Sequence, residues 1–413
     1  MIETAAGPGR PGAIAILSHS YYEEDPRVRR QAESLAAAGW RVDVFGLQRP
    51  GDPRRSRLAG VEIHHLSVQR HQGAGPATYL AEYLAFFVRA AFALSGAAIR
   101  RRFDVVQVAT LPDWLVFAAL PLKLAGVPVL LDLHEAMPDF FATRFPGLAR
   151  PWSRGLIRAA ERASLAASTR AITVNSALRD RLVALGARAD RIDVVPNSVS
   201  LARFDPARYP ARAFMVDRQL RLIYAGALTP TYELDVVLRA LALVRARRPN
   251  LELRLDLYGR GDAETSLRTL AAELGLADAV DFHGRIPIED VPAAIAASDI
   301  GLAPTRLDAF TRSSLSTKIF EYAAMAKPVV ASRLPMIERE LPPDAVALYE
   351  PGDVEALGER VLEIVDAAGT RSDRVEALRS WVAGRSWDAD AVRYVELIEQ
   401  MVEGRRAPRF RRP

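Results

Sequence analysis

Short runs of apolar residues alternate along the chain with longer stretches in which apolar residues recur every three or four positions. The first run, AIAILS at 13–18, precedes a helical pattern over 26–38 and a second run, RVDVFGL, at 41–47. Because this order is that of a strand, a crossover helix and a parallel strand, it predicts a βαβ unit. Asp25 suits the N-cap of the helix and Gly39 its end.

Further apolar runs continue this rhythm in both halves of the chain. They are VEIHHLSV, FDVVQVAT, VPVLLDLH and AITVNS in the first half, and LRLIYAGAL, LELRLDLYG, AVDFHG, IGLAPT, PVVAS and AVALYE in the second. Most are nearly continuous in apolar residues, which is typical of parallel strands covered on both faces. Residues 195–218 interrupt the rhythm with three prolines and little periodicity, so we place a linker at 199–218.

The length of 413 residues indicates two domains rather than one core. We expect an α/β protein of two Rossmann-like, doubly wound domains whose parallel sheets face each other across a cleft, one at 1–198 and one at 219–385. The pattern allows the helical stretch 386–403 to pack on either domain. We adopt the option that it packs back on the first domain. Residues 404–413 form a basic tail.

Composition narrows the class of protein. Half of the residues are apolar and 25% are charged, as in soluble globular proteins. The chain contains no cysteine, which excludes disulfides and Cys-based zinc sites and fits the cytoplasmic location that we expect. The formal net charge of +5 is modest, and we therefore expect no nucleic acid among the partners.

One apolar segment, 79–99, is long enough to cross a bilayer, and Arg100, Arg101 and Arg102 follow it. Glu82 and Arg89 lie within the segment and argue against a membrane span. We favour a helix buried in an α/β domain. The alternative is a helix that docks peripherally on an anionic membrane beside the arginines, at the inner membrane face.

The stretch TRSSLSTKIFEYAAMAKPVVAS, residues 311–332, carries the most informative chemistry. Of the 55 basic residues only three are lysines, and Lys318 stands in the first turn of a predicted helix, where the helix dipole disfavours a cation. An anion docked on the N–H groups and hydroxyls at this helix start explains the placement. Glu321, three residues later, can accept two hydrogen bonds from a ribose diol. The pair predicts a nucleoside-diphosphate site, and the alternative is an ordinary i,i+3 ion pair.

The chain resembles the retaining glycosyltransferases of family 4, which have the GT-B fold of two facing Rossmann-like domains. DPRVRRQAESLAAAGWRVDVFGL is similar to the first βαβ unit of that family and LIYAGALTPTYELDVVLRAL to the opening of its second domain. LYGRGD, VDFHGRIPIEDVPAAIAASDIGLAP and STKIFEYAAMAKPVVAS follow in the family's order. The resemblance covers nearly the whole chain. It implies transfer of a sugar from a nucleoside-diphosphate sugar to a glycan or lipid-linked acceptor, without cofactor or metal, in surface polysaccharide or glycolipid assembly.

The resemblance, together with the local chemistry, assigns roles to individual residues. It implies that the first domain binds the acceptor and the second the nucleotide sugar. The expected catalytic residues are Lys318, His134 and Arg312. Glu135 and Asp25 are expected on the acceptor side. The expected donor-binding residues are Glu321 at the ribose, Gly226 and Ala227 at the diphosphate, Gly284, Arg285 and Ile286 at the base, and Ser313, Ser314 and Thr317 at the anion site.

Three positions depart from the family's pattern. Ser313 stands where many members have the first of two glutamates, and Ala227 and Tyr232 stand where many have arginine and lysine. Lys318 and Arg312 are the nearest replacements for the missing cations. Two alternatives to a transferase therefore remain open: a nucleotide-sugar epimerase of the same fold, and a non-catalytic partner subunit.

A few other polar residues receive structural interpretations. Asp308 is interpreted as a turn residue, and Arg27 and Arg30 as solvated residues of the first helix. His64 and His65 have no further ligand at a metal-binding spacing, so we assign no metal site.

Overall fold

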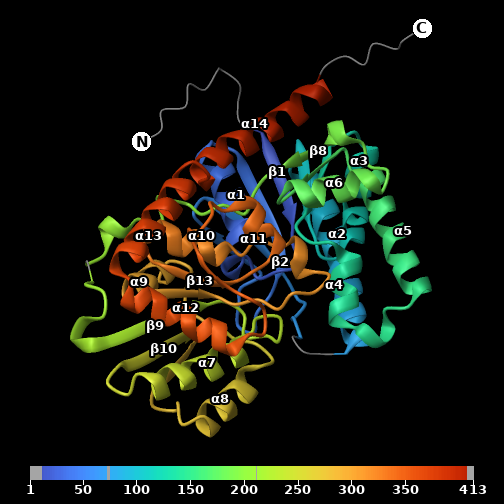
Figure 1. The fold of residues 1–413 in the computed structure, drawn as a ribbon. Coiled ribbons are helices and arrows are strands. Elements are labelled where there is room, and N and C mark those ends of the chain that lie inside the picture. The colour runs from blue at the N-terminus through green and yellow to red at the C-terminus, as the bar shows by residue number, and fades with distance from the viewer. Residues whose placement is uncertain (1–11, 72–74, 211, 407–413) are drawn as a thin grey trace. The chain divides into compact units, whose positions relative to one another are not determined.

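A computed structural model describes residues 12–71, 75–210 and 212–406 of the chain (Figure 1). The chain divides into two compact units. The first contains the residues up to Pro196 and those from Ala391 onward, and the second contains Asn197–Asp390. The predicted basic tail at 404–413 falls mostly on 407–413, outside the described residues.

The first unit is built on an eight-stranded sheet in the order β3-β4-β2-β1-β5-β6-β7-β8. Neighbouring strands are parallel except for the antiparallel pair β3 and β4. The strands are β1 (Ala13–Leu17), β2 (Arg41–Leu47), β3 (Arg55–Leu58), β4 (Val61–Leu66), β5 (Val105–Ala109), β6 (Val129–Leu133), β7 (Arg170–Thr173) and β8 (Ile192–Val194). Strand β3, with the polar sequence RSRL, was not predicted.

Helices connect these strands and cover the sheet. They are η1 (Tyr22–Glu24), α1 (Pro26–Ala37), α2 (Pro76–Arg100), η2 (Asp113–Ala119), α3 (Leu120–Leu124), α4 (Met137–Arg144), η3 (Pro146–Leu148), α5 (Pro151–Ala167), α6 (Ser176–Ala184) and η4 (Ala189–Arg191). All five residues of β1 are buried, as expected of a strand covered on both faces. The predicted N-cap is confirmed, because the Asp25 side chain accepts hydrogen bonds from the N–H groups of Arg27 and Val28.

The second unit has a six-stranded, wholly parallel sheet in the order β11-β10-β9-β12-β13-β14. Its strands are β9 (Gln219–Ala225), β10 (Glu252–Tyr258), β11 (Val280–Gly284), β12 (Ile300–Ala303), β13 (Val329–Ser332) and β14 (Ala347–Tyr349). Its helices are η5 (Pro206–Arg208), η6 (Val216–Arg218), α7 (Leu234–Arg247), α8 (Glu264–Glu273), α9 (Val291–Ala296), η7 (Thr311–Ser313), α10 (Thr317–Ala324), α11 (Pro335–Glu340), α12 (Val354–Asp366) and α13 (Ala368–Ala383). The last helix, α14 (Trp387–Arg406), runs from the second unit into the first.

In each sheet there is one topological switch point, a pair of neighbouring strands from which successive strands are added outward in opposite directions. In the first unit it lies between β1 and β5, and in the second between β9 and β12. Ligands of open parallel sheets bind at the carboxyl ends of the strands beside such a point. The predicted class, two Rossmann-like parallel α/β sheets, is confirmed, and a ligand site is expected at these two strand edges.

Candidate functional site

Lys318 lies at the second position of α10, as the sequence predicted, and its side chain is buried. Its Nζ stands 5.0 Å from the ring centroid of Tyr224 and 4.1 Å from that of Tyr232. Among the described residues no ion pair joins this Nζ to a carboxylate, so the alternative of a Lys318–Glu321 pair is not formed. Aromatic faces hold an ammonium by cation–π attraction but leave its charge uncompensated.

The loop after β9 makes room for this lysine. A Cβ built on Gly226 would come within 2.4 Å of the Lys318 Cε, so a glycine is needed for the close approach. The neighbouring Ala227 accepts a hydrogen bond of 2.7 Å from the Tyr224 hydroxyl, which fixes that ring below the lysine. The structure therefore brings together Lys318, Gly226 and Ala227, and it adds two tyrosines to the group.

The predicted base-binding loop lies two strands away along the same edge. The N–H of Gly226 donates to Tyr258 at the end of β10, and the N–H of Gly259 donates to Gly284 at the end of β11. Gly284 has a φ of +69°, which favours glycine. Beyond it, Arg285 is exposed and Ile286 is half-buried. The carboxyl ends of β9, β10 and β11 thus form a continuous, glycine-lined edge.

The segment before α10 is ordered by its own turns. Asp308 accepts hydrogen bonds from the N–H groups of Phe310 and Thr311, both at 2.8 Å, which confirms its interpretation as a turn residue. Arg312 is exposed, while Ser313, Ser314 and Thr317 are half-buried. The hydroxyls of the two serines make long hydrogen bonds, of 3.4 and 3.3 Å, to the Phe310 carbonyl.

Glu321 lies one turn after Lys318 and is half-buried. The next residue, Tyr322, is fully buried, and its hydroxyl accepts a hydrogen bond from the Ala225 N–H at the end of β9. Burial raises the pKa of this tyrosine far above its usual range, so it stays protonated. Helix α10 is thereby fixed against the carboxyl end of β9, beside the point where the sheet changes direction.

In the first unit, His134 directly follows β6 and is buried. Its Nε2 lies 3.1 Å from the Oδ2 of Asp132, without the alignment of a hydrogen bond. Burial, reinforced by the charge of Arg27, lowers the pKa of His134, and Asp132 opposes the shift only in part. The imidazole is therefore neutral at pH 7 and can exchange hydrogen bonds with a polar ligand.

A buried chain of polar side chains holds the carboxylate beside His134. Asp132 Oδ2 accepts hydrogen bonds from the amides of Gln31, at 2.9 Å, and Gln107, at 3.1 Å. Gln107 in turn accepts one from the hydroxyl of Tyr394 on α14. This hydrogen bond joins α14 to β5 at the centre of the first sheet, and the predicted domain bounds stay a prediction.

Asp25, Glu135 and His134 share the neighbouring charge of Arg27, and the pKa values of the two carboxyl groups shift in opposite directions. Burial alone would raise the pKa of Asp25, but Arg27, the Val28 N–H and His134 outweigh it and lower the pKa. Burial raises the pKa of Glu135, against the opposing charges of Arg27 and Arg70. The two residues expected on the acceptor side thus lie in one electrostatic cluster with His134.

Sequence reasoning missed other members of this region. Arg27 was interpreted as a solvated residue, but its side chain is largely buried and lies 3.6 Å from Asp25. His19, at the carboxyl end of β1, lies 3.0 Å from Glu82 and packs edge-on against Phe86. Burial lowers the pKa of His19. The sequence does contain a signal for Arg27, because this residue, like Lys318, is a cation in the first turn of a helix, where the helix dipole disfavours it.

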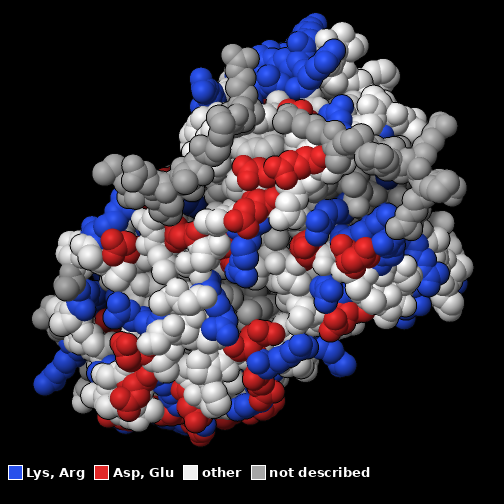
Figure 2. Space-filling view, turned by 90° about the horizontal axis from the view of Figure 1, so that it is seen from above, with Lys and Arg blue, Asp and Glu red and all other residues white. Residues whose placement is uncertain are grey.

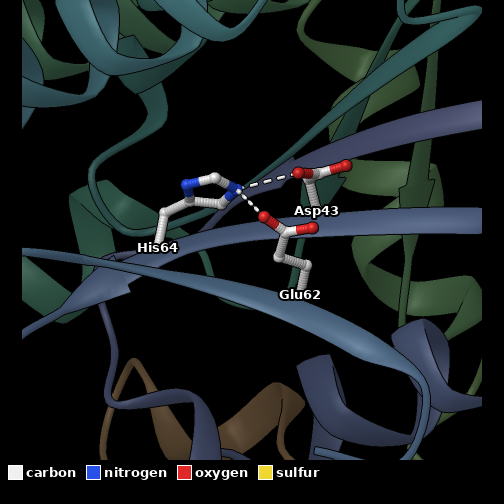
Figure 3. Close-up of side chains that lie close together, drawn as sticks. All are labelled: Asp43, Glu62 and His64. Carbon is white, nitrogen blue, oxygen red and sulfur yellow. Dashed lines mark hydrogen bonds and ion pairs between the residues drawn. The ribbon is translucent and has the colours of Figure 1, made fainter. Parts of the chain in front are cut away.

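The structure also supplies partners for His64 that the sequence did not reveal. His64, Asp43 and Glu62 bring their side chains together from β4 and β2 (Figure 3), with His64 Nε2 2.8 Å from Asp43 and 3.9 Å from Glu62. Arg101 lies 2.6 Å from Glu62 and 3.3 Å from Asp43. Because this guanidinium already takes the place of a cation, the cluster is an ion-pair network, and the absence of a metal stays a prediction.

Charged side chains of both signs are interspersed over the face seen in Figure 2, with a group of Lys and Arg side chains at its upper margin. This distribution contrasts with the single basic stripe typical of a nucleic-acid-binding face. The expectation that nucleic acid is not a partner stays a prediction.

Two family models match the chain, one in each half. The model described as a glycosyl transferase 4-like domain matches residues 25–198, and the model described as glycosyl transferases group 1 matches residues 219–367. The two matches together cover every strand of both sheets except β1, while His19 and Tyr394 lie outside them.

Curated relatives show the same resemblance at low identity. The D-inositol 3-phosphate glycosyltransferase of Arthrobacter sp. (strain FB24) is 27% identical over 229 residues, which are 53% of this chain and 53% of the relative. This chain therefore matches about half the length of that relative. The enzyme of the same name from Paenarthrobacter aurescens (strain TC1) is 24% identical over 92% of this chain and 94% of its own.

Solved structures share the fold. Sucrose-phosphate synthase from Thermosynechococcus elongatus superposes with a TM-score of 0.74 at 18% identity, covering 95% of this chain and 100% of that one. Anabaena HepE in complex with UDP-glucose gives a TM-score of 0.68 at 14% identity, covering 95% of this chain and 100% of its own. At these identities the likeness concerns the fold alone.

Proposed function

Because this chain belongs to glycosyltransferase family 4 and has the GT-B fold, we propose that it transfers a hexose, with retention of anomeric configuration, from a nucleoside-diphosphate sugar to an acceptor hydroxyl. The observation that carries the proposal is the buried ammonium of Lys318, which has no carboxylate partner among the described residues and stands at the start of α10. A bound diphosphate would supply the counter-charge that this ammonium lacks.

The proposed reaction breaks the bond between the anomeric carbon and the diphosphate oxygen and forms one from that carbon to the acceptor oxygen. The acceptor's hydroxyl proton leaves with the departing diphosphate. Lys318 and the backbone N–H groups at the start of α10 would stabilise the negative charge that develops on the diphosphate. We propose that this cationic end replaces a metal ion in that task.

The remaining assignments follow from the same proposal. Glu321 would bind the ribose, the loop of Gly284, Arg285 and Ile286 the base, and Gly226 and Ala227 the diphosphate. Arg312, with the hydroxyls of Ser313, Ser314 and Thr317, would complete the anion site. His134 would contact the donor sugar, supported by its neutral, buried imidazole. Glu135 and Asp25 would lie toward the acceptor.

We further propose a cytoplasmic enzyme of surface polysaccharide or glycolipid assembly, acting on a glycan or lipid-linked acceptor at the inner membrane face. The relatives named D-inositol 3-phosphate glycosyltransferase support a polyol or glycan hydroxyl as the acceptor class. The outward face of α2, described in the next subsection, supports peripheral contact with the membrane.

The test is a screen of UDP-, GDP-, dTDP- and ADP-sugars by thermal shift, followed by product analysis with the sugar that binds. Binding raises the unfolding temperature by mass action. We expect one donor to stabilise the protein and to yield a glycosylated product only when an acceptor is present. An epimerised sugar formed from the donor alone would instead identify an epimerase, and no stabilisation by any donor would identify a non-catalytic subunit.

A further inference from the structure

Helix α2 has one face in the protein core and the other in solvent. Phe86, Ala90 and Leu94 are fully buried in the core of the first unit. On the opposite side Phe92 is 77% exposed and Ile99 is 87% exposed. The expectation of a fully buried helix is therefore wrong for this outer face, because apolar residues surround the helix and only half of them reach the core.

The exposed side of α2 forms one apolar stripe. Leu80, Leu84, Val88 and Phe92 follow each other at intervals of four residues, and all are exposed. At 100° per residue they span about one third of the helix circumference, opposite the buried side. The only acidic residue of the helix, Glu82, is buried. Exposed Arg89 flanks the stripe, and exposed Arg100 ends the helix.

Helix α2 is the one helix of the described ranges that is long and apolar enough to cross a membrane, and only a minor part of it is buried. It cannot leave the sheet without exposing Phe86, Ala90 and Leu94, which belong to the core of the first unit. Its chemistry therefore suits a helix that lies on a membrane surface and stays attached to its unit.

A second helix of the same unit has the same character. On α5, Trp152 is 69% exposed and Leu156 is 65% exposed. Arg154, Arg158 and Arg162 form an exposed stripe at the other margin of its solvent-facing side, while the acidic residue, Glu161, is buried against Arg181. Tryptophan and leucine on one side of an exposed helix and arginines on the other are typical of helices that lie in the interface of a bilayer.

The two helices belong to one surface region. Both α2 and α5 pack against η2, with the Phe87 ring of α2 5.5 Å from Trp114. Helix α3 contacts α2 and is also joined to the end of α5. Its Lys123 donates a hydrogen bond to the carbonyl of Ser168, just beyond α5. Figure 1 shows α2, α3 and α5 on the same side of the first sheet. Leu124 on α3 adds a further exposed apolar side chain.

We infer that the outward faces of α2 and α5 dock the first unit on an anionic lipid surface. The apolar stripes would enter the headgroup boundary, and the arginines would meet lipid phosphates. The exposed charges of both helices are all positive, so a symmetric pair of copies would place like charges against each other. A second copy therefore suits this face less well than an anionic membrane.

Docking on a membrane would bring the enzyme to the lipid-linked acceptor of the proposed function, and the inference rests on that proposed function. Its test does not use transfer activity, so the two can fail separately. The purified chain is floated with vesicles of phosphatidylcholine alone and with vesicles that also contain phosphatidylglycerol. We expect it to float with the anionic vesicles and to remain in solution with the neutral ones.

Variants identify the docking face. Replacing Arg154 and Arg158 by Gln should weaken binding roughly five-fold for each arginine, and Phe92→Ser with Trp152→Ser should weaken it by about tenfold or more. Leu307→Ser removes an exposed leucine of the second unit and should leave binding unchanged. Because all these side chains are exposed, unchanged unfolding temperatures show that the variants are folded.

Three results would overturn the inference. The first is a chain that floats with neither kind of vesicle. The second is binding that ignores both the anionic lipid and the arginine replacements. The third is a dimer in sedimentation analysis that Phe92→Ser and Trp152→Ser dissociate, which would assign the face to a second copy of the chain.

Discussion

Helices α1 and α10 begin alike, with a cation at the second helical position and no acidic residue in the first turn. In α1 the N-cap Asp25 accepts two backbone hydrogen bonds and lies 3.6 Å from Arg27. In α10 the N-cap Ser316 makes no side-chain cap hydrogen bond, and Lys318 contacts aromatic rings. The positive end of α1 is therefore neutralised within the protein, whereas that of α10 remains available to an anion.

The difference shows that a first-turn cation does not by itself indicate a ligand site. The deciding feature is whether the protein supplies the counter-charge. An aspartate at the N-cap closes the site in α1, and a serine at the same position leaves it open in α10. The predictions below test this contrast, from the largest expected effect to the smallest.

The largest effect is expected from Lys318→Ala. Removing the ammonium that stabilises the departing diphosphate should lower turnover by about 10²–10³-fold, measured as product formation at saturating donor. Lys327→Met is the matched control, because the Lys327 ammonium donates to the carbonyls of Ala296 and Ser298 and serves the fold. The control should lose stability but keep its turnover; equal losses in both variants would contradict the assignment.

Gly226→Ala should displace the side chain of the same lysine without removing its charge. The new Cβ would meet Lys318 Cε at 2.4 Å, and the flexible side chain would move away from its place. We expect nucleoside-diphosphate affinity to fall about tenfold, measured by calorimetry, with little change in unfolding temperature. A large loss of stability without loss of affinity would show that the glycine serves packing alone.

Replacing the two N-caps by alanine should give unequal losses of stability. Asp25→Ala removes two cap hydrogen bonds and should lower the free energy of unfolding by about 1 kcal/mol. Ser316→Ala removes no cap bond and should change it by less than about 0.5 kcal/mol. Urea denaturation measures both. Equal losses would mean that α10 is capped like α1 and would remove the contrast between them.

The smallest effect concerns pH. The folded-state pKa of Asp25 is lowered, so the unfolded chain binds more protons in the window below the ordinary aspartate pKa. This stabilisation is present at neutral pH and disappears as the pH falls through the lowered value. Asn caps a helix without a charge. The stability advantage of the wild type over Asp25→Asn should therefore shrink below about pH 4; an advantage that grows there would contradict the assignment.

Local patterns predicted much of the fold. The N-cap at Asp25, the helix start before Lys318 and the turn at Asp308 depend on neighbouring residues, so the sequence reveals them directly. The continuous apolar runs likewise indicated parallel sheets covered on both faces. Strand β3 escaped prediction because its sequence, RSRL, is short and polar.

Contacts between distant segments could not be predicted in the same way. The sequence shows that Tyr232 replaces a cation of the family pattern, but only the fold shows its ring 4.1 Å from Lys318. Tyr394 and Gln107 are 287 residues apart, and nothing local indicates their hydrogen bond. In α2 apolar residues surround the helix, so its periodicity could not tell which face meets solvent.

The central claim is that a diphosphate rests against the start of α10 and meets the Lys318 ammonium. Calorimetry of the preferred nucleoside diphosphate and of the matching nucleoside, with the wild type and with Lys318→Met, tests it as a double-mutant cycle. The account predicts that the wild type prefers the diphosphate by about tenfold or more and that the variant loses most of this preference. An undiminished preference for the diphosphate in Lys318→Met would contradict it.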